Sequence, residues 1–525
     1  MDKDAKYIRL LTSGRGSWSK SHMTEVEPER VGLEKGEDGP YLSRIEWEGL
    51  QGKWEIEKLK ESPILPSASQ KIKVWRDEQY KIKAKVTGTP TDALGGMFPD
   101  HVEPGSIVPS VELNGSDLNG RIDYKLSGCA VESTSQTGNE SFEASLVTRR
   151  VRRTFLKRES AETAWLTEWY LNSYSKNTPL LYPRPVKREL KEEYRKEREF
   201  LGEDITFEGY RKGTVGLCAF VETPDVSFLV QPVPKELGPP WSKCLGIEYR
   251  HEWGGIPDAD DREAIANILS FLMGRPLVGV GYTAFDRRGH AVEQVAISPP
   301  ASNLVAMCKK PEQPPINLDQ RKPPSIFEGL LRKMVPCYLA ISEELNIDEV
   351  LWGYWLADQL PLGTDLPVFA TSIEILMNAW YKSKKSKSKG TYMLKAEFDK
   401  LLKDEFKAIK AKLEGVEYGD RILSRMCNTF QMGVNERFDF FFEEIGLPVG
   451  ECERKAIKAR NRVAHASPGL LDERAYDDMV NNALAYRTLF NRILLKIMGY
   501  GGSYVDLSAL GWPERPLDQP IGKSP

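Results

Sequence analysis

The stretch ECERKAIKARNRVAHASPG, residues 451–469, predicts an amphipathic helix with a defined end. Its apolar residues recur at the three- and four-residue spacings that place side chains on one helix face. That inward stripe consists of Ala456, Ile457, Val463 and Ala464. The helix should stop at His465, because Ser467-Pro468-Gly469 cannot continue it.

Three polar residues, Arg460, Asn461 and His465, stand together in the last turns of this helix. Arg460 lies three or four residues from each member of the apolar stripe, so we expect it to face the packed side. Arg462 shares the outer face with two lysines and is expected to serve solubility. Asn461 and His465 are i,i+4 neighbours, which lets the amide orient the imidazole.

This arrangement suits metal-free RNA cleavage. A histidine in the last helical turn feels the negative end of the helix dipole, so it can donate or accept protons near neutral pH. An inward arginine must find an anion, and it can stabilise the charged transition state when a 2′-hydroxyl attacks the adjacent phosphate. The alternative is purely structural: Arg460 forms a salt bridge with a helix carboxylate such as Glu374, and His465 only ends the helix.

Helical patterns flank this stretch from about residue 325 to 500, which predicts a helical bundle in the C-terminal third. In residues 473–498 the apolar side chains again follow helical spacing. A loop between bundle helices, YKSKKSKSKG at 381–390, is rich in lysine. We predict that Lys384, Lys385 and Lys387 contact the RNA backbone; a solvated or flexible loop is the alternative.

Up to about residue 320 the sequence is β-rich, with alternating stretches such as KIKVW (71–75) and FEASLVT (142–148) between turn residues. Asp258 should cap a helix that Gly274 ends, followed by a hairpin whose turn is 286–289.

Two charged runs in this half are expected to lie in solvent. KRELKEEYRKEREF (187–200) predicts a solvated helix, and the basic run at 149–158 a solvated surface.

Composition limits the classes of function. The 525 residues are 40% hydrophobic and carry a net charge of −3, so any contact with nucleic acid must come from local patches. No signal-peptide core and no run of about 18 apolar residues is present, so we expect a cytoplasmic protein with no membrane segment. Seven scattered cysteines without a CxxC pair, and five histidines, predict neither a metal site nor a cofactor.

The Arg460-Asn461-x-x-x-His465 segment, on the penultimate helix of a C-terminal bundle, resembles the motif of HEPN-domain ribonucleases. A β-rich half followed by such a bundle resembles the ApeA-like HEPN proteins of bacterial anti-phage defence. The resemblance implies a metal-independent endoribonuclease, the toxic effector of an abortive-infection system. It also implies that Arg460 and His465 are catalytic, that Asn461 supports them, and that two protomers share one site. The implied partners are RNA, with tRNA among the candidates, a second copy bound through the helical domain, and a phage-derived trigger.

We therefore expect an α+β multidomain chain, a β-rich N-terminal half followed by an all-α HEPN-like bundle. The expected divisions are a β-rich domain at 1–230, an α/β extension at 231–318, the bundle at 319–502 and a tail at 503–525. The main boundary lies in the proline-rich stretch 299–325, and the tail should be ordered only by docking. Two alternatives remain: a non-catalytic HEPN-like nucleotide- or RNA-binding module, and a ligand-binding β domain dimerised by its helical half.

Overall fold

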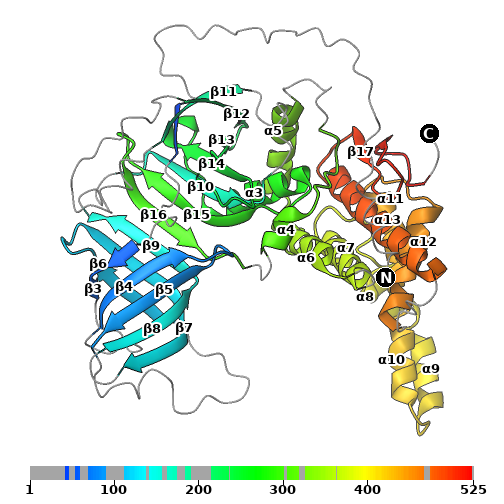
Figure 1. Ribbon diagram of the computed structural model, residues 1–525. Helices are drawn as coiled ribbons and strands as arrows, with labels where there is room; N and C mark the ends of the chain where they lie inside the picture. The colour runs from blue at the N-terminus through cyan, green and yellow to red at the C-terminus, as the bar shows by residue number, and fades with distance from the viewer. Residues whose placement is uncertain are drawn as a thin grey trace, which may run out of the picture.

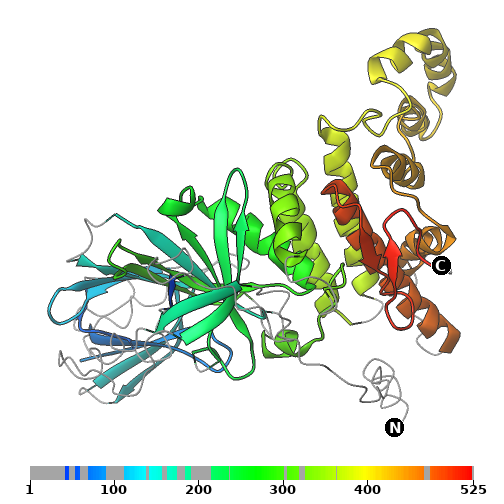
Figure 2. The ribbon, with the colours of Figure 1, turned by 90° about the horizontal axis from the view of Figure 1, so that it is seen from above.

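The protein is described here by a computed structural model with a β-rich part followed by a helical part, as predicted (Figure 1). The structure describes residues 42–45, 54–59, 69–89, 111–137, 141–156, 162–173, 184–190, 214–235, 237–300, 304–318, 326–361, 364–465 and 473–522. Seen from above, the strands lie to one side of the molecule and the helices to the other (Figure 2).

The first strands pair in a ring. They are β2 (Trp54–Ile56), β3 (Lys58–Leu59), β4 (Ser69–Arg76), β5 (Ile82–Gly88), β6 (Val111–Ser116), β7 (Ile122–Thr137) and β8 (Ser141–Thr148). β4 pairs with β5, β5 with β8, and β8 with the second half of β7; the first half of β7 pairs with β6, β6 with β3, and β2 with β4. Alternate side chains such as Trp54, Val86 and Phe142 are buried inside this barrel, as period-2 alternation requires.

β7 also begins a long sheet. In pairing order it continues through β9 (Arg150–Phe155), β16 (Ala291–Ile297), β15 (Val278–Phe285), β10 (Trp165–Leu171), β14 (Cys244–Arg250), β13 (Ser227–Pro232), β12 (Thr214–Glu222), β11 (Arg184–Leu190) and β1 (Leu42–Ile45). All these pairs are antiparallel except β1 with β11. The long β7 strand thus makes the barrel and the sheet one structure.

Two expectations for charged runs are wrong in part. Residues Lys187–Leu190 belong to β11 near the sheet edge and not to a helix, because charged residues are common on outer strands and pairing with β12 overrides the local pattern. The rest of that run lies outside the described residues. Arg153 is fully buried, since β9 alternates and turns it inward, where it donates to Gln294 at 3.0 Å and stacks on Phe155.

The predicted helix and hairpin in the middle of the chain are confirmed. α3 (Ala259–Met273) begins at Asp258, whose side chain accepts from the Asp261 amide at 2.9 Å. It ends at Gly274, which has a φ of 68° and lies so close to the backbone of Gln313 that no side chain would fit. β15 and β16 then form the hairpin, and α3 contributes its apolar face to the core beside the sheet.

The helical part is α5 (Ile326–Leu339), α6 (Ile347–Gln359), α7 (Asp365–Lys382), α8 (Lys395–Leu401), α9 (Lys403–Leu413), α10 (Gly419–Cys427), α11 (Val434–Glu444), α12 (Glu451–His465) and α13 (Glu473–Ile497). Both ribbon views show α9 and α10 projecting away from the other helices (Figures 1 and 2). A short helix, α4 (Leu304–Lys309), lies in the proline-rich stretch. One apolar core runs from Phe228 and Ile247 of the sheet through α3 and α5 into the bundle, so the β-rich and helical parts pack together. The domain division near residue 319 stays a prediction.

The chain beyond α13 is held by buried charges. β17 (Ser503–Val505) and β18 (Glu514–Pro516) form a hairpin against α13. Arg492 of α13, fully buried, donates to the Leu517 carbonyl at 2.8 Å and lies 5.0 Å from the centre of the Tyr504 ring. Arg515 pairs with Asp506 at 2.7 Å within the hairpin. The described part of the predicted tail, residues 503–522, is therefore ordered, and docking orders it.

Candidate functional site

α12 carries the predicted site and packs against α7 and α13. Ala456 and Ile457 are buried, at 0% and 6% exposure, so the inward stripe is confirmed at these positions. Lys455 and Lys458 are exposed, as expected of the outer face. The helix phase predicted from sequence is therefore the phase that the structure adopts over the first part of α12.

The motif itself occupies the last turns of this helix. α12 ends at His465, as predicted, and Arg460 and Asn461 lie one to two turns before that end. The side chains of these three residues lie outside the described part of the chain. The catalytic role of Arg460 and its alternative salt bridge with Glu374 accordingly both stay predictions.

A buried ion pair fixes the beginning of α12. Glu453 pairs with Arg492 of α13, and neither side chain is exposed to solvent. Glu453 also accepts from the Gly450 amide at 2.6 Å, while Arg492 donates to the Pro448 carbonyl at 2.9 Å. Burial raises the pKa of Glu453, against the lowering effects of Arg492 and the Gly450 amide. This pair ties the two helices at one end, and sequence reasoning missed it because the partners are 39 residues apart.

The lysine-rich loop, residues 383–390, lies between α7 and α8 as predicted and has a fixed backbone. Glu444, the last residue of α11, accepts from the amides of Lys387 at 3.2 Å and Ser388 at 2.8 Å, and from the indole of Trp380 at 2.8 Å. Lys389 donates to the Ser383 carbonyl. Lysine side chains at 384, 385 and 387 are exposed. The loop is therefore a folded turn that presents these lysines to solvent.

The electrostatics of Glu444 fit this anchoring role. Burial opposes its ionisation, but hydrogen bonds from the Ser388 amide, the Trp380 indole and nearby serine hydroxyls outweigh burial and lower its pKa. The carboxylate is thus held in its charged form at the centre of the turn. Nothing in the sequence marks Glu444, since it lies 54 residues or more beyond the loop that it holds.

The motif and the lysine-rich loop lie on different elements. The loop is held by α7 and α11, whereas His465 lies about 18 Å along the axis of α12 from Glu453, at a rise of 1.5 Å per residue. The RNA-binding role of Lys384, Lys385 and Lys387 stays a prediction.

The described part of the chain contains no group of three or more His, Cys, Asp and Glu side chains that could hold a metal ion. Within the same residues, no helix is both long enough and apolar enough to cross a bilayer.

Comparison of the chain with protein-family models, with curated proteins and with solved structures finds no match.

Proposed function

We propose that this chain is a metal-independent endoribonuclease of HEPN type. The observation that supports the proposal most directly is the position of Arg460-Asn461-x-x-x-His465 in the last turns of α12, the penultimate helix of the helical part. His465 ends its helix, which is where the helix dipole supports a protonatable imidazole. The sequence spacing and the end of α12 at His465 both support this proposal.

In the proposed reaction the 2′-hydroxyl of a ribose attacks the adjacent phosphorus and the bond to the 5′-oxygen breaks. The products are a 2′,3′-cyclic phosphate and a free 5′-hydroxyl. His465 moves a proton, Arg460 stabilises the charge that develops on the phosphate oxygens, and Asn461 orients the imidazole.

The proposed active species is a homodimer. Cleavage is fastest with both a base for the 2′-hydroxyl and an acid for the departing 5′-oxygen, and one motif supplies a single histidine. Two-fold pairing through the helical part would bring two copies of His465 and Arg460 to one phosphate.

The proposed biological role is that of a toxic effector in anti-phage defence, with the β-rich half as sensor or regulator and a phage-derived trigger. The continuous core from the sheet through α3 and α5 into the bundle supports communication between the β-rich half and the bundle. A change in packing at one end of this core can be transmitted to the other through neighbouring side chains. The exposed lysines of the lysine-rich loop would add sequence-independent affinity for RNA, with tRNA among the substrates considered.

The test incubates purified protein with total RNA in EDTA and identifies fragment ends. We expect 2′,3′-cyclic phosphate ends from the wild type and none from Arg460→Ala or His465→Ala. Arg462→Ala, two residues from Arg460 and predicted on the outer face, is the matched control and should cleave normally. RNA binding without cleavage by the wild type would instead select the non-catalytic module, and an essential Arg462 with a dispensable Arg460 would refute the assigned roles.

A further inference from the structure

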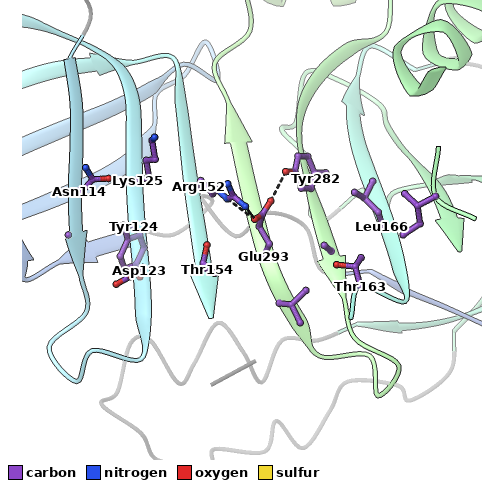
Figure 3. Close-up of a pocket in the computed structure, with 14 residues that line it drawn as sticks. Asn114, Asp123, Tyr124, Lys125, Arg152, Thr154, Thr163, Leu166, Tyr282 and Glu293 are labelled. Atoms are coloured by element: carbon purple, nitrogen blue, oxygen red, sulfur yellow. Dashed lines mark hydrogen bonds and ion pairs between the residues drawn. The ribbon is translucent and has the colours of Figure 1, made fainter. Parts of the chain in front are cut away.

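A groove of about 620 Å³ crosses the open face of the long sheet where β7, β9, β16, β15 and β10 are neighbours (Figure 3). Thr163, just before β10, and Ile256, just before α3, border it. The volume is in the usual range for small-molecule sites. Arg152 and Thr154 of the basic run at 149–158 line this groove, but neither the α12 motif nor the lysine-rich loop does, so it is a separate candidate site.

Strand register arranges the groove side chains in two rows. One row crosses five strands and contains Asp123, Thr154, Glu293, Ala284 and Leu166, each paired with the next. Lys125 and Arg152 are paired in the parallel row two residues along, and Tyr282 lies in that row on β15. Neighbouring strands are about 4.8 Å apart, so the first row spans roughly 19 Å. The groove thus runs across the strands, polar at its β7 end and apolar at its β10 end.

The charges in the polar part balance. Glu293 accepts from the Tyr282 hydroxyl at 2.5 Å and from Arg152 Nε at 2.6 Å, and burial together with that hydrogen bond raises the pKa of Tyr282 to about 12 (Figure 3). Lys125 pairs with Glu112 at 2.9 Å. The residues that line the groove thus carry two cations, Lys125 and Arg152, and two anions, Asp123 and Glu293. Such a groove has no net field to attract a polyanion.

Several polar groups in the groove are available to a ligand. Among the residues that the structure describes, the side chains of Asn114, Asp123, Thr154 and Thr163 have no hydrogen-bond or ion-pair partner and line the groove. Asn114, Asp123 and Thr154 offer donors and acceptors toward the β7 end of the groove, and Thr163 offers a hydroxyl toward the β10 end. At the other end, Leu166 and Ala284 are nearly buried and form an apolar floor.

We propose that this groove binds a short, neutral oligosaccharide. Sugar hydroxyls both donate and accept, so they can donate to Asp123 while accepting from Asn114 and Arg152. The C–H face of a sugar ring can cover Ala284 and Leu166. A peptide fits less well, because peptides commonly add to a sheet edge, whereas this groove crosses a face whose backbone groups are already paired within the sheet.

The test uses the full chain and isothermal titration with neutral trisaccharides built from glucose, galactose, mannose or N-acetylglucosamine. Poly(U) RNA and a mixed heptapeptide library serve as the other probes. Asp123→Asn and Thr154→Val keep side-chain shape while removing a charge or a hydroxyl, and each should weaken saccharide binding about tenfold or more. Glu143→Gln and Thr87→Val make the same chemical changes on barrel strands β8 and β5, outside the groove, and should bind as the wild type does.

The expected result is binding of at least one trisaccharide, lost in the two groove variants and kept in the two controls, with unchanged thermal midpoints in all four. Failure of every trisaccharide to bind at 10 mM would overturn the proposal. So would equal binding by the groove variants and the wild type, or a peptide or RNA whose binding depends on Asp123. His465→Ala should bind the saccharide normally, which separates this proposal from the proposed nuclease activity.

Discussion

Removing the carboxylate of Glu444 should open the lysine-rich loop. Glu444→Ala deletes the acceptor for three donors, the amides of Lys387 and Ser388 and the indole of Trp380. Hydrogen bonds to a charged group contribute about 1.5–3 kcal/mol each when buried, and Glu444 is only partly buried, so we take about 1 kcal/mol for each. Only the two amide bonds are broken when the loop opens, because Trp380 lies on α7, so about 2 kcal/mol corresponds to a rise of roughly 30-fold in the population of the open loop.

Limited trypsin proteolysis measures this opening, since the loop contains several lysines on a folded backbone. When opening and closing are fast, the rate of cleavage follows the open population. Mass spectrometry of the fragments would report cleavage within 383–390 and nowhere else in the bundle. Glu443→Ala is the matched control, because Glu443 is the exposed neighbour and its side chain has no hydrogen-bond or ion-pair partner among the described residues. Glu444→Gln, which keeps an acceptor without the charge, should fall between the wild type and Glu444→Ala.

Acid should have the same effect as the substitution. The pKa of Glu444 is lower in the folded protein than in the unfolded chain. The ionised carboxylate therefore stabilises the closed loop fully above the ordinary carboxyl range, and this stabilisation is lost as the pH falls through the folded pKa. Amide exchange of the loop, corrected for intrinsic rates, should therefore increase on acidification in the wild type and change less in Glu444→Ala. Equal trypsin cleavage of Glu444→Ala and Glu443→Ala would refute the anchoring role.

Three further predictions concern other parts of the chain. Mixing His465→Ala with wild type at varying ratios should give RNA cleavage that departs from the wild-type fraction, and strict proportionality from a species of monomer mass by light scattering would defeat the shared site. Arg492→Met should destabilise the fold by about 3–5 kcal/mol in urea unfolding, because it leaves Glu453 buried without its cation; an unchanged midpoint would mean that the pair contributes nothing. Tyr282 has a pKa of about 12 in the folded protein, so its stabilising contribution is complete below about pH 10 and is lost between pH 10 and 12. In Tyr282→Phe the free energy of unfolding should therefore fall less steeply between pH 10 and 12 than in the wild type.

Local signals in the sequence were enough for several elements of this protein. Ser467-Pro468-Gly469 cannot extend a helix, and α12 ends at His465. Asp258 and Gly274 bound α3 because capping depends on residues within one turn. Buried and exposed side chains alternate along the barrel strands as the sequence predicted, because a two-residue period is a property of each strand alone. The place of the motif on the penultimate helix was therefore predictable.

Only the tertiary structure decided which charges are buried and what they hold. Arg153 belongs to a run that appears solvated, but β9 lies between β7 and β16 and turns it into the core. The tail is ordered because Arg492 reaches Leu517, and the lysine-rich loop is fixed because Glu444 of α11 reaches back to it. The groove brings Asp123 and Glu293 into one row, although 170 residues separate them in the sequence. Each of these contacts is made between distant segments, and pairing across such distances depends on the register of the whole sheet and bundle and not on any local pattern.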